Sequence, residues 1–211
     1  MEFRDAIQDF SEQPITRQIL LDLLKEYKRP YDKISELVRQ GILQLVKRGI
    51  YIPGPALNMA VPEPFLLANH LLGPSYVSME TALAYRGWIP EKVYEISSMT
   101  IRNSTLYNTD AVRYSYTHLP LPYYSFGLQY VELTKKQTAM VATPEKALCD
   151  KIVTTAGVLL RSTNQVKEFL IDDMRIDEER LGQIDVQVIS SWATDAPKKS
   201  SIDMLIKTLS R

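Results

Sequence analysis

The chain has 211 residues, enough for one or two domains with a buried core, and its 25 basic and 25 acidic residues cancel. This balance gives no sign of a nucleic-acid partner at the level of total charge. The single cysteine, Cys149, excludes an internal disulfide framework. With no signal-like start and no long apolar run, we expect a cytoplasmic protein that does not enter a membrane.

Two helices are predicted at the N-terminus. The first should span about two turns, because apolar residues recur there at helical spacing: Phe3, Ala6, Ile7 and Phe10. The second should begin after Thr16 as its N-cap, with Ile15 and Leu20 placed as a hydrophobic staple. Its apolar face is expected to continue to Tyr27.

A third helix followed by a β-hairpin is predicted over residues 30–54. Pro30 suits the first helical position, and Gly41 suits the left-handed residue that ends a helix. Residues 42–46 and 50–52 are rich in strand-forming types. The turn between them, Lys47-Arg48-Gly49, is cationic. Three short helices and a hairpin within residues 1–55 predict a winged helix-turn-helix domain.

Local charge supports a DNA-binding role for this domain. Seven basic residues and three acidic ones lie between Lys25 and Pro55, a local excess of four positive charges. On the third helix, Tyr31, Ser35 and Arg39 recur every four residues, away from the apolar stripe. The full set of candidate DNA-binding residues is Lys28, Arg29, Tyr31, Lys33, Ser35, Arg39, Lys47 and Arg48.

Residues 56–211 predict a second, larger α+β domain after a proline-rich connection. Helices should begin at Pro64 and after Ser78, and strands should cover 93–99, 111–117, 126–133 and 138–141, forming a small antiparallel sheet. A strong helix is expected after Thr143, with a buried face made of Leu148, Ile152, Ala156 and Leu159. A helical tail follows, with helices near 186–192 and 202–209.

Four blocks of this sequence resemble a known family. They are LVRQGILQLVKRGIYIPG, PSYVSMETALAYRGWIP, the segment beginning VYEISSMT, and VATPEKALCDKI. Together they resemble the AbiEi-type antitoxins of abortive-infection, or type IV, toxin–antitoxin systems. The resemblance implies a winged-helix domain that binds operator DNA and represses its own operon. It also implies a C-terminal domain that counters a cognate toxin resembling nucleotidyltransferases.

The sequence offers little that indicates catalysis, and we expect neither an enzyme nor a bound cofactor or metal. Cys149 is expected to be a buried small residue rather than a nucleophile. With only His70 and His118 available, a zinc site is not expected. Tyrosines between 114 and 130 could stack on single-stranded RNA, although a sheet core or a partner interface is the expected use: Tyr114, Tyr116, Tyr123, Tyr124 and Tyr130.

Two other functions compete with the DNA-binding regulator. The first is a protein-interaction module in which the winged helix has only a structural role; absence of DNA binding at any salt concentration would favour it. The second is a metal-dependent nuclease that uses Asp110, Glu145 and Lys146. Metal-dependent cleavage that is lost in Asp110→Ala would support the nuclease.

Overall fold

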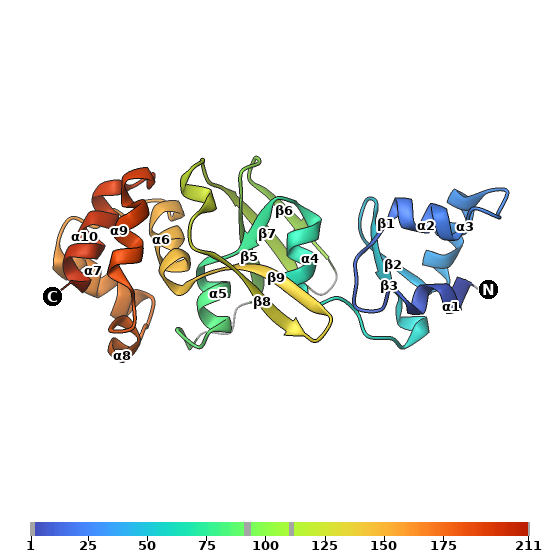
Figure 1. The fold of residues 1–211 in the computed structure, drawn as a ribbon, viewed down its shortest axis with the longest axis horizontal. Coiled ribbons are helices and arrows are strands. Elements are labelled where there is room, and N and C mark those ends of the chain that lie inside the picture. The colour runs from blue at the N-terminus through green and yellow to red at the C-terminus, as the bar shows by residue number, and fades with distance from the viewer. Residues whose placement is uncertain (1–2, 91–93, 110–111, 211) are drawn as a thin grey trace. The chain divides into compact units, whose positions relative to one another are not determined.

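A computed structural model describes residues 3–90, 94–109 and 112–210. The fold is mixed α+β, with one three-stranded antiparallel sheet and one six-stranded mixed sheet (Figure 1). The chain divides into two compact units. The first contains the residues up to Leu71 together with Glu132–Thr138, and the second contains Leu72–Val131 and the residues from Ala139 onward.

The first unit alternates short helices with a small sheet. The strand order in this sheet is β1-β3-β2, and both strand pairs are antiparallel. In chain order the elements are α1 Phe3–Gln8, β1 Ile15–Thr16, α2 Arg17–Leu23, α3 Pro30–Arg39, β2 Leu43–Lys47, β3 Ile50–Pro53, the 3-10 turn η1 Pro55–Leu57 and α4 Pro64–Leu71.

Local capping chemistry places the predicted helices of this unit. The Thr16 hydroxyl accepts a hydrogen bond from the Ile19 amide at 3.4 Å, which confirms Thr16 as the N-cap of α2. Pro30 is the first residue of α3, and Gly41 follows the helix with φ of +68°. The expectation that the apolar face of α2 reaches Tyr27 is wrong, because the helix ends at Leu23 and Tyr27 is 46% exposed.

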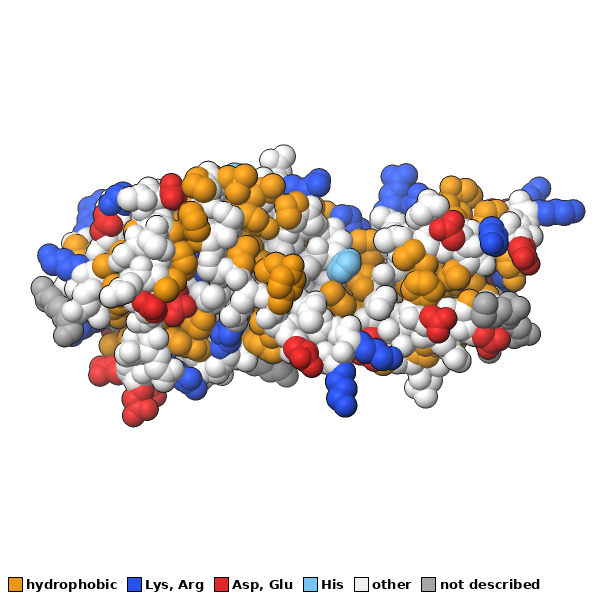
Figure 2. Space-filling view, in the orientation of Figure 1, with side chains coloured by type: hydrophobic (Ala, Val, Ile, Leu, Met, Phe, Trp, Pro, Cys, Tyr) orange, Lys and Arg blue, Asp and Glu red, His pale blue; other side chains and the backbone are white. Residues whose placement is uncertain are grey.

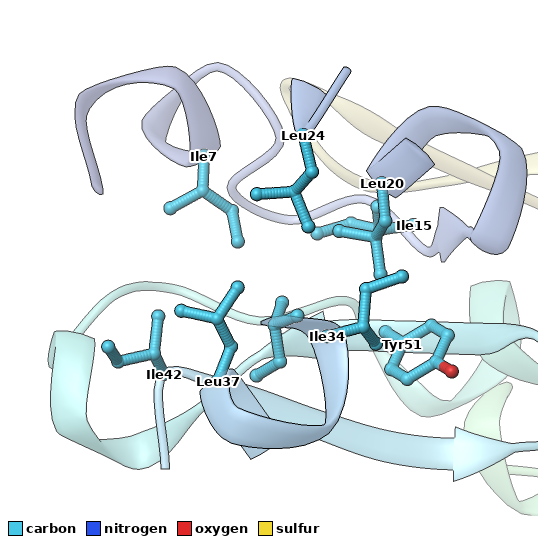
Figure 3. Close-up of a cluster of buried hydrophobic side chains, with 9 residues drawn as sticks. Ile7, Ile15, Leu20, Leu24, Ile34, Leu37, Ile42 and Tyr51 are labelled. Carbon is cyan, nitrogen blue, oxygen red and sulfur yellow. The ribbon is translucent and has the colours of Figure 1, made fainter. Parts of the chain in front are cut away.

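Figure 3 shows the core of the first unit, where side chains from α1, β1 and α2 meet those from α3 and the hairpin. Ile15 and Leu20, the predicted staple, are both fully buried. The nine buried members are Ile7, Ile15, Leu20, Leu24, Ile34, Leu37, Ile42, Leu43 and Tyr51. Such burial stabilises the unit by roughly 1.5–3 kcal/mol for each large apolar side chain.

The first unit extends past residue 55, where we expected a domain boundary, and it includes the distant segment Glu132–Thr138. The carboxylate of Glu12 accepts hydrogen bonds from the Thr134 hydroxyl and the Gln137 amide, both at 3.0 Å. The Gln137 side chain in turn accepts from the Glu63 backbone amide at 2.7 Å. These polar bonds connect segments that are more than 70 residues apart in the sequence.

The sheet of the second unit is larger than predicted and is not purely antiparallel. Its strand order is β6-β7-β5-β4-β9-β8, and β5 pairs with β7, and β4 with β9, in parallel. The prediction of an antiparallel sheet is therefore wrong. β6 is the edge strand next to β7, so β7 pairs on its other side with β5, in parallel. The strands are β4 Ser75–Val77, β5 Glu95–Thr100, β6 Thr105–Asn108, β7 Arg113–His118, β8 Leu128–Thr134 and β9 Gln137–Ala142. Residues 93 and 111, at two predicted strand starts, lie outside the described residues.

Helices of the second unit gather around α6 and α10, as Figure 1 shows. They are α5 Met79–Tyr85, the 3-10 turn η2 Tyr123–Ser125, α6 Pro144–Thr154, α7 Thr163–Lys167, the π-helical turn η3 Glu168–Asp173, α8 Glu178–Leu181, α9 Val186–Trp192, the 3-10 turn η4 Ala193–Asp195 and α10 Lys199–Leu209. In the described part of the chain, every helix is too short or too polar to cross a membrane.

Two expectations about α6 need correction. The helix ends at Thr154, so Ala156 and Leu159 are not part of it, and Leu159 is 50% exposed. Its buried face includes two charged residues, Lys146 and Asp150, beside the expected Leu148 and Ile152. Thr143 caps the helix as predicted, accepting from the Lys146 amide at 3.3 Å.

Candidate nucleic-acid interface

The outer face of α3 carries three of the predicted residues. Ile34 and Leu37 are buried in the core of the first unit, which turns Tyr31, Ser35 and Arg39 toward solvent. Tyr31 is 60% exposed. The Ser35 hydroxyl donates to the Tyr31 carbonyl at 3.1 Å, so it is already used within the helix. This face therefore presents an aromatic ring and a guanidinium separated by a small residue.

Two cations near the start of α3 have carboxylate partners. Arg29 lies 3.8 Å from Asp32, and both side chains are exposed, so this pair contributes little to stability. Lys33 donates to Glu36 at 3.0 Å, and this hydrogen bond lowers the pKa of the Glu36 carboxyl. Arg29 and Lys33 therefore bring less uncompensated positive charge to the surface than the sequence alone indicates.

The hairpin tip, which we define as Lys47, Arg48 and Gly49, places its two cations differently. Gly49 has φ of +88°, a conformation that suits glycine in a tight turn. The register between β2 and β3 shifts between Leu45 and Lys47. Lys47 is half-buried, and its ammonium donates to the Leu71 carbonyl at the end of α4, at 2.7 Å. Arg48 is exposed.

Arg17 lies at the hairpin tip, although we did not include it among the candidates. Thr16 pairs with Ile50 in the sheet, and the Arg17 amide donates to the Gly49 carbonyl at 2.9 Å. A guanidinium nitrogen of Arg17 lies 4.0 Å from the position that a Cβ on Gly49 would take. From the sequence alone, Arg17 is only a surface residue of a helix, because the pairing of the two-residue strand β1 has no local signal.

Several cations of the first unit that lack an ion-pair partner lie at the hairpin tip and around α3. Among the residues that the structure describes, Arg17, Lys28, Arg39 and Arg48 take part in no ion pair. Figure 2 shows blue side chains over the hairpin tip and over the turn between α2 and α3. Arg17 is half-buried and the other three are exposed, and cations at a surface that have no ion-pair partner attract the phosphates of a nucleic acid.

Of the three candidate nuclease residues, the structure describes Glu145 and Lys146, whereas Asp110 lies outside the described residues. The Glu145 carboxylate accepts from the Asp185 amide at 3.3 Å, whereas Lys146 is fully buried. Within residues 3–90, 94–109 and 112–210, no group of three or more His, Cys, Asp or Glu side chains could hold a metal ion. His118 lies near the Arg102 carbonyl, at 3.2 Å from Nδ1.

Lys146 and Asp150 form a buried polar centre that the sequence did not reveal. Their charged groups lie 2.9 Å apart, and neither side chain is exposed. Asp150 also accepts from the Tyr76 and Ser78 hydroxyls at 2.9 and 2.7 Å. Lys146 donates to the Tyr123 carbonyl at 2.9 Å. Burial raises the pKa of the Asp150 carboxyl and lowers that of the Lys146 ammonium, while their attraction opposes both shifts. A centre closed to solvent has no room for a substrate.

The tyrosines that could have stacked on RNA serve mainly as core. Four of the five are buried: Tyr114, Tyr116, Tyr123 and Tyr124. Tyr130, on the edge strand β8, is 76% exposed. Cys149 is fully buried as expected, and burial raises the pKa of its thiol.

A groove of about 970 Å³ lies beside α1, the end of α2 and α3 in the first unit. Its apolar lining includes Phe3, Leu23, Leu37 and Ile42. Charged side chains from the α2–α3 region also line it, among them Asp22, Lys25, Glu26 and Lys33. An apolar surface with charged neighbours is a form that protein-binding sites often take.

No protein-family model matches this sequence, and no curated protein matches it. We therefore base the proposed function on the geometry of the first unit and on the sequence blocks described above.

Proposed function

We propose that this protein is a non-catalytic transcriptional regulator that binds double-stranded operator DNA through a winged helix-turn-helix in its first unit. The observation that carries the proposal is the element order α1-β1-α2-α3-β2-β3, in which an outward-facing α3 is followed by a cationic hairpin. In this mode the outer face of α3 enters the major groove, and the hairpin tip contacts the neighbouring backbone.

The operator is proposed to lie upstream of the protein's own gene. Fluorescence anisotropy with a labelled duplex from that region, and with a shuffled duplex of equal length, tests this directly. We expect the native duplex to bind at least about 10³-fold more tightly at physiological salt, the lower end for specific regulators. Equal binding of both duplexes would contradict an operator in this region, and absence of binding to either would contradict the function.

The antitoxin role is a further part of the proposal and rests on the resemblance of the four sequence blocks. It assigns the second unit to the neutralisation of a nucleotidyltransferase-like toxin encoded next to this gene. Co-expression of the two genes in a host that the toxin arrests tests the role. We expect the full chain to restore growth, and continued arrest at equal toxin levels would contradict it. Co-elution of the purified pair in gel filtration then tests direct contact.

A protein-interaction module is the second candidate, and the groove beside α1 and α3 is the observation that favours it. Leu23→Glu, at a half-buried lining position, separates the two functions. A regulator whose winged helix binds DNA should keep its DNA affinity in this variant if the unit remains folded. A module that binds protein through the groove should lose its partner and show no DNA binding at any salt concentration.

A further inference from the structure

The two cations at the hairpin tip, Lys47 and Arg48, differ in burial and in their hydrogen bonds. The ammonium of Lys47 is turned to the first unit's own backbone, 2.7 Å from the Leu71 carbonyl, and its side chain is half-buried. Arg48, the next residue, is exposed and takes part in no ion pair among the described residues. The register shift between Leu45 and Lys47 accompanies this difference.

A second guanidinium reaches the hairpin tip from α2. Sheet pairing fixes this position, because Thr16 lies opposite Ile50 and the Arg17 amide donates to Gly49. The guanidinium lies 4.0 Å from where a Gly49 side chain would begin, and in the described chain no carboxylate pairs with it. Because Gly49 has no side chain, the backbone between Arg17 and Arg48 is open to close approach.

We propose that Arg17 and Arg48 form a paired contact with backbone phosphates of duplex DNA, and that Lys47 positions the hairpin tip without contacting DNA. This inference rests on the proposed function and deepens it by assigning the roles of three residues. Guanidinium groups bind phosphate oxygens through two parallel hydrogen bonds, which suits them to this contact. The bond from Lys47 to Leu71 fixes the end of β2, which Arg48 follows directly.

The salt dependence of DNA binding separates a phosphate contact from a positioning role. Each phosphate contact that is lost should reduce the slope of log K against log salt by about one, whatever the DNA sequence. We therefore expect Arg17→Ala and Arg48→Ala each to reduce the slope by about one, measured by anisotropy with a random-sequence duplex. Lys47→Met should weaken binding at every salt concentration and leave the slope unchanged. Arg161→Ala, an exposed arginine of the second unit, is the matched control and should change neither quantity.

Two results would overturn the assignment. An Arg17→Ala protein that binds the duplex with the wild-type slope would remove Arg17 from the contact, and a Lys47→Met slope reduced by about one would make Lys47 a phosphate contact. Absence of wild-type binding even at low salt would overturn the proposed function itself, which keeps the two failures distinct.

Discussion

Lys146 and Asp150 place two opposite charges at fully buried positions of the second unit. Removing two charges from water is costly, and their attraction offsets that cost only when the remaining hydrogen bonds are made. Here Asp150 Oδ1 faces the Lys146 ammonium, the Tyr76 and Ser78 hydroxyls donate to Oδ2, and Lys146 also donates to the Tyr123 carbonyl. The centre therefore connects α6 to β4, to the start of α5 and to η2.

Removal of the cation alone should be strongly destabilising. Lys146→Met keeps the length of the side chain but leaves the Asp150 carboxylate buried without its partner. We expect the free energy of unfolding to fall by about 3–5 kcal/mol. Both tryptophans, Trp88 and Trp192, belong to the second unit, so their fluorescence in a urea titration reports this change.

The double variant Lys146→Met/Asp150→Asn is the control for this pair. Asparagine keeps an oxygen that accepts from Tyr76 and Ser78 but carries no charge, so the double variant should be more stable than Lys146→Met. A single variant within about 1 kcal/mol of the wild type would contradict the importance of the pair.

Gly127 packs against the same centre and should tolerate no side chain. Its φ is +63°, and an added Cβ would lie 2.6 Å from the Lys146 Cβ. Gly157 has a similar φ of +78° but nothing within 4 Å of such a Cβ. We expect Gly157→Ala to cost about 1–2 kcal/mol from backbone strain alone and Gly127→Ala to cost at least about 1 kcal/mol more. Urea titrations that give the same loss in free energy of unfolding for both variants would contradict this, because the contact of the added Cβ with Lys146 would then have no energetic cost.

At the scale of elements, the two faces of α3 should respond differently to alanine. Leu37→Ala removes a buried side chain and should lower the free energy of unfolding by about 2–5 kcal/mol. Tyr31→Ala, on the exposed face, should change it by less than about 0.5 kcal/mol. Circular dichroism during urea unfolding measures both, because the first unit has no tryptophan.

For DNA affinity we expect the opposite order: among the folded proteins, Tyr31→Ala should weaken binding more than Leu37→Ala. Tyr31→Ala is expected to weaken specific binding by about tenfold, near the low end for a base contact. A Tyr31→Ala variant with full specific affinity would place the DNA elsewhere than on the outer face of α3.

Buried tyrosines of the second unit give a pH dependence with a defined sign. Burial raises the pKa of Tyr114 and of Tyr124 to about 12. Because the folded values lie above the unfolded value of about 10, their stabilisation is complete below pH 10 and is lost as the pH rises toward 12. We expect stability to fall in this window, with tyrosinate absorbance from these residues appearing only as the second unit unfolds. Titration of all tyrosines near pH 10 in a protein whose tryptophan fluorescence is still native would contradict this.

Local chemistry explains which elements could be predicted. Thr16, Pro30 and Thr143 act within one turn of their own helices, so the starts of α2, α3 and α6 are confirmed. The strands β1 and β4 are two and three residues long and have no periodicity of their own. Parallel pairing of β5 with β7 depends on the whole sheet, which no local pattern contains.

At the scale of the molecule, the distribution of charge matters more than its sum. The net charge is zero, yet the cations without an ion-pair partner in the described first unit include four that lie at the hairpin and around α3: Arg17, Lys28, Arg39 and Arg48. The candidate list from the sequence contained three of these but not Arg17. Its position, like the inward turn of Lys47, depends on tertiary contacts, here with Gly49 and Leu71.

The measurement that tests DNA binding by the first unit most directly compares two charge-neutralised proteins. In one, glutamine replaces the four cations of the first unit named above: Arg17, Lys28, Arg39 and Arg48. In the other, glutamine replaces four exposed cations of the second unit: Arg102, Arg161, Lys167 and Lys207. Both proteins lose the same charge, and anisotropy with the native duplex across a salt titration compares them. We expect the first-unit variant to lose specific binding, with a slope reduced by about three to four, and the second-unit variant to bind like the wild type. Wild-type binding by the first-unit variant, with binding lost in the other, would contradict the account.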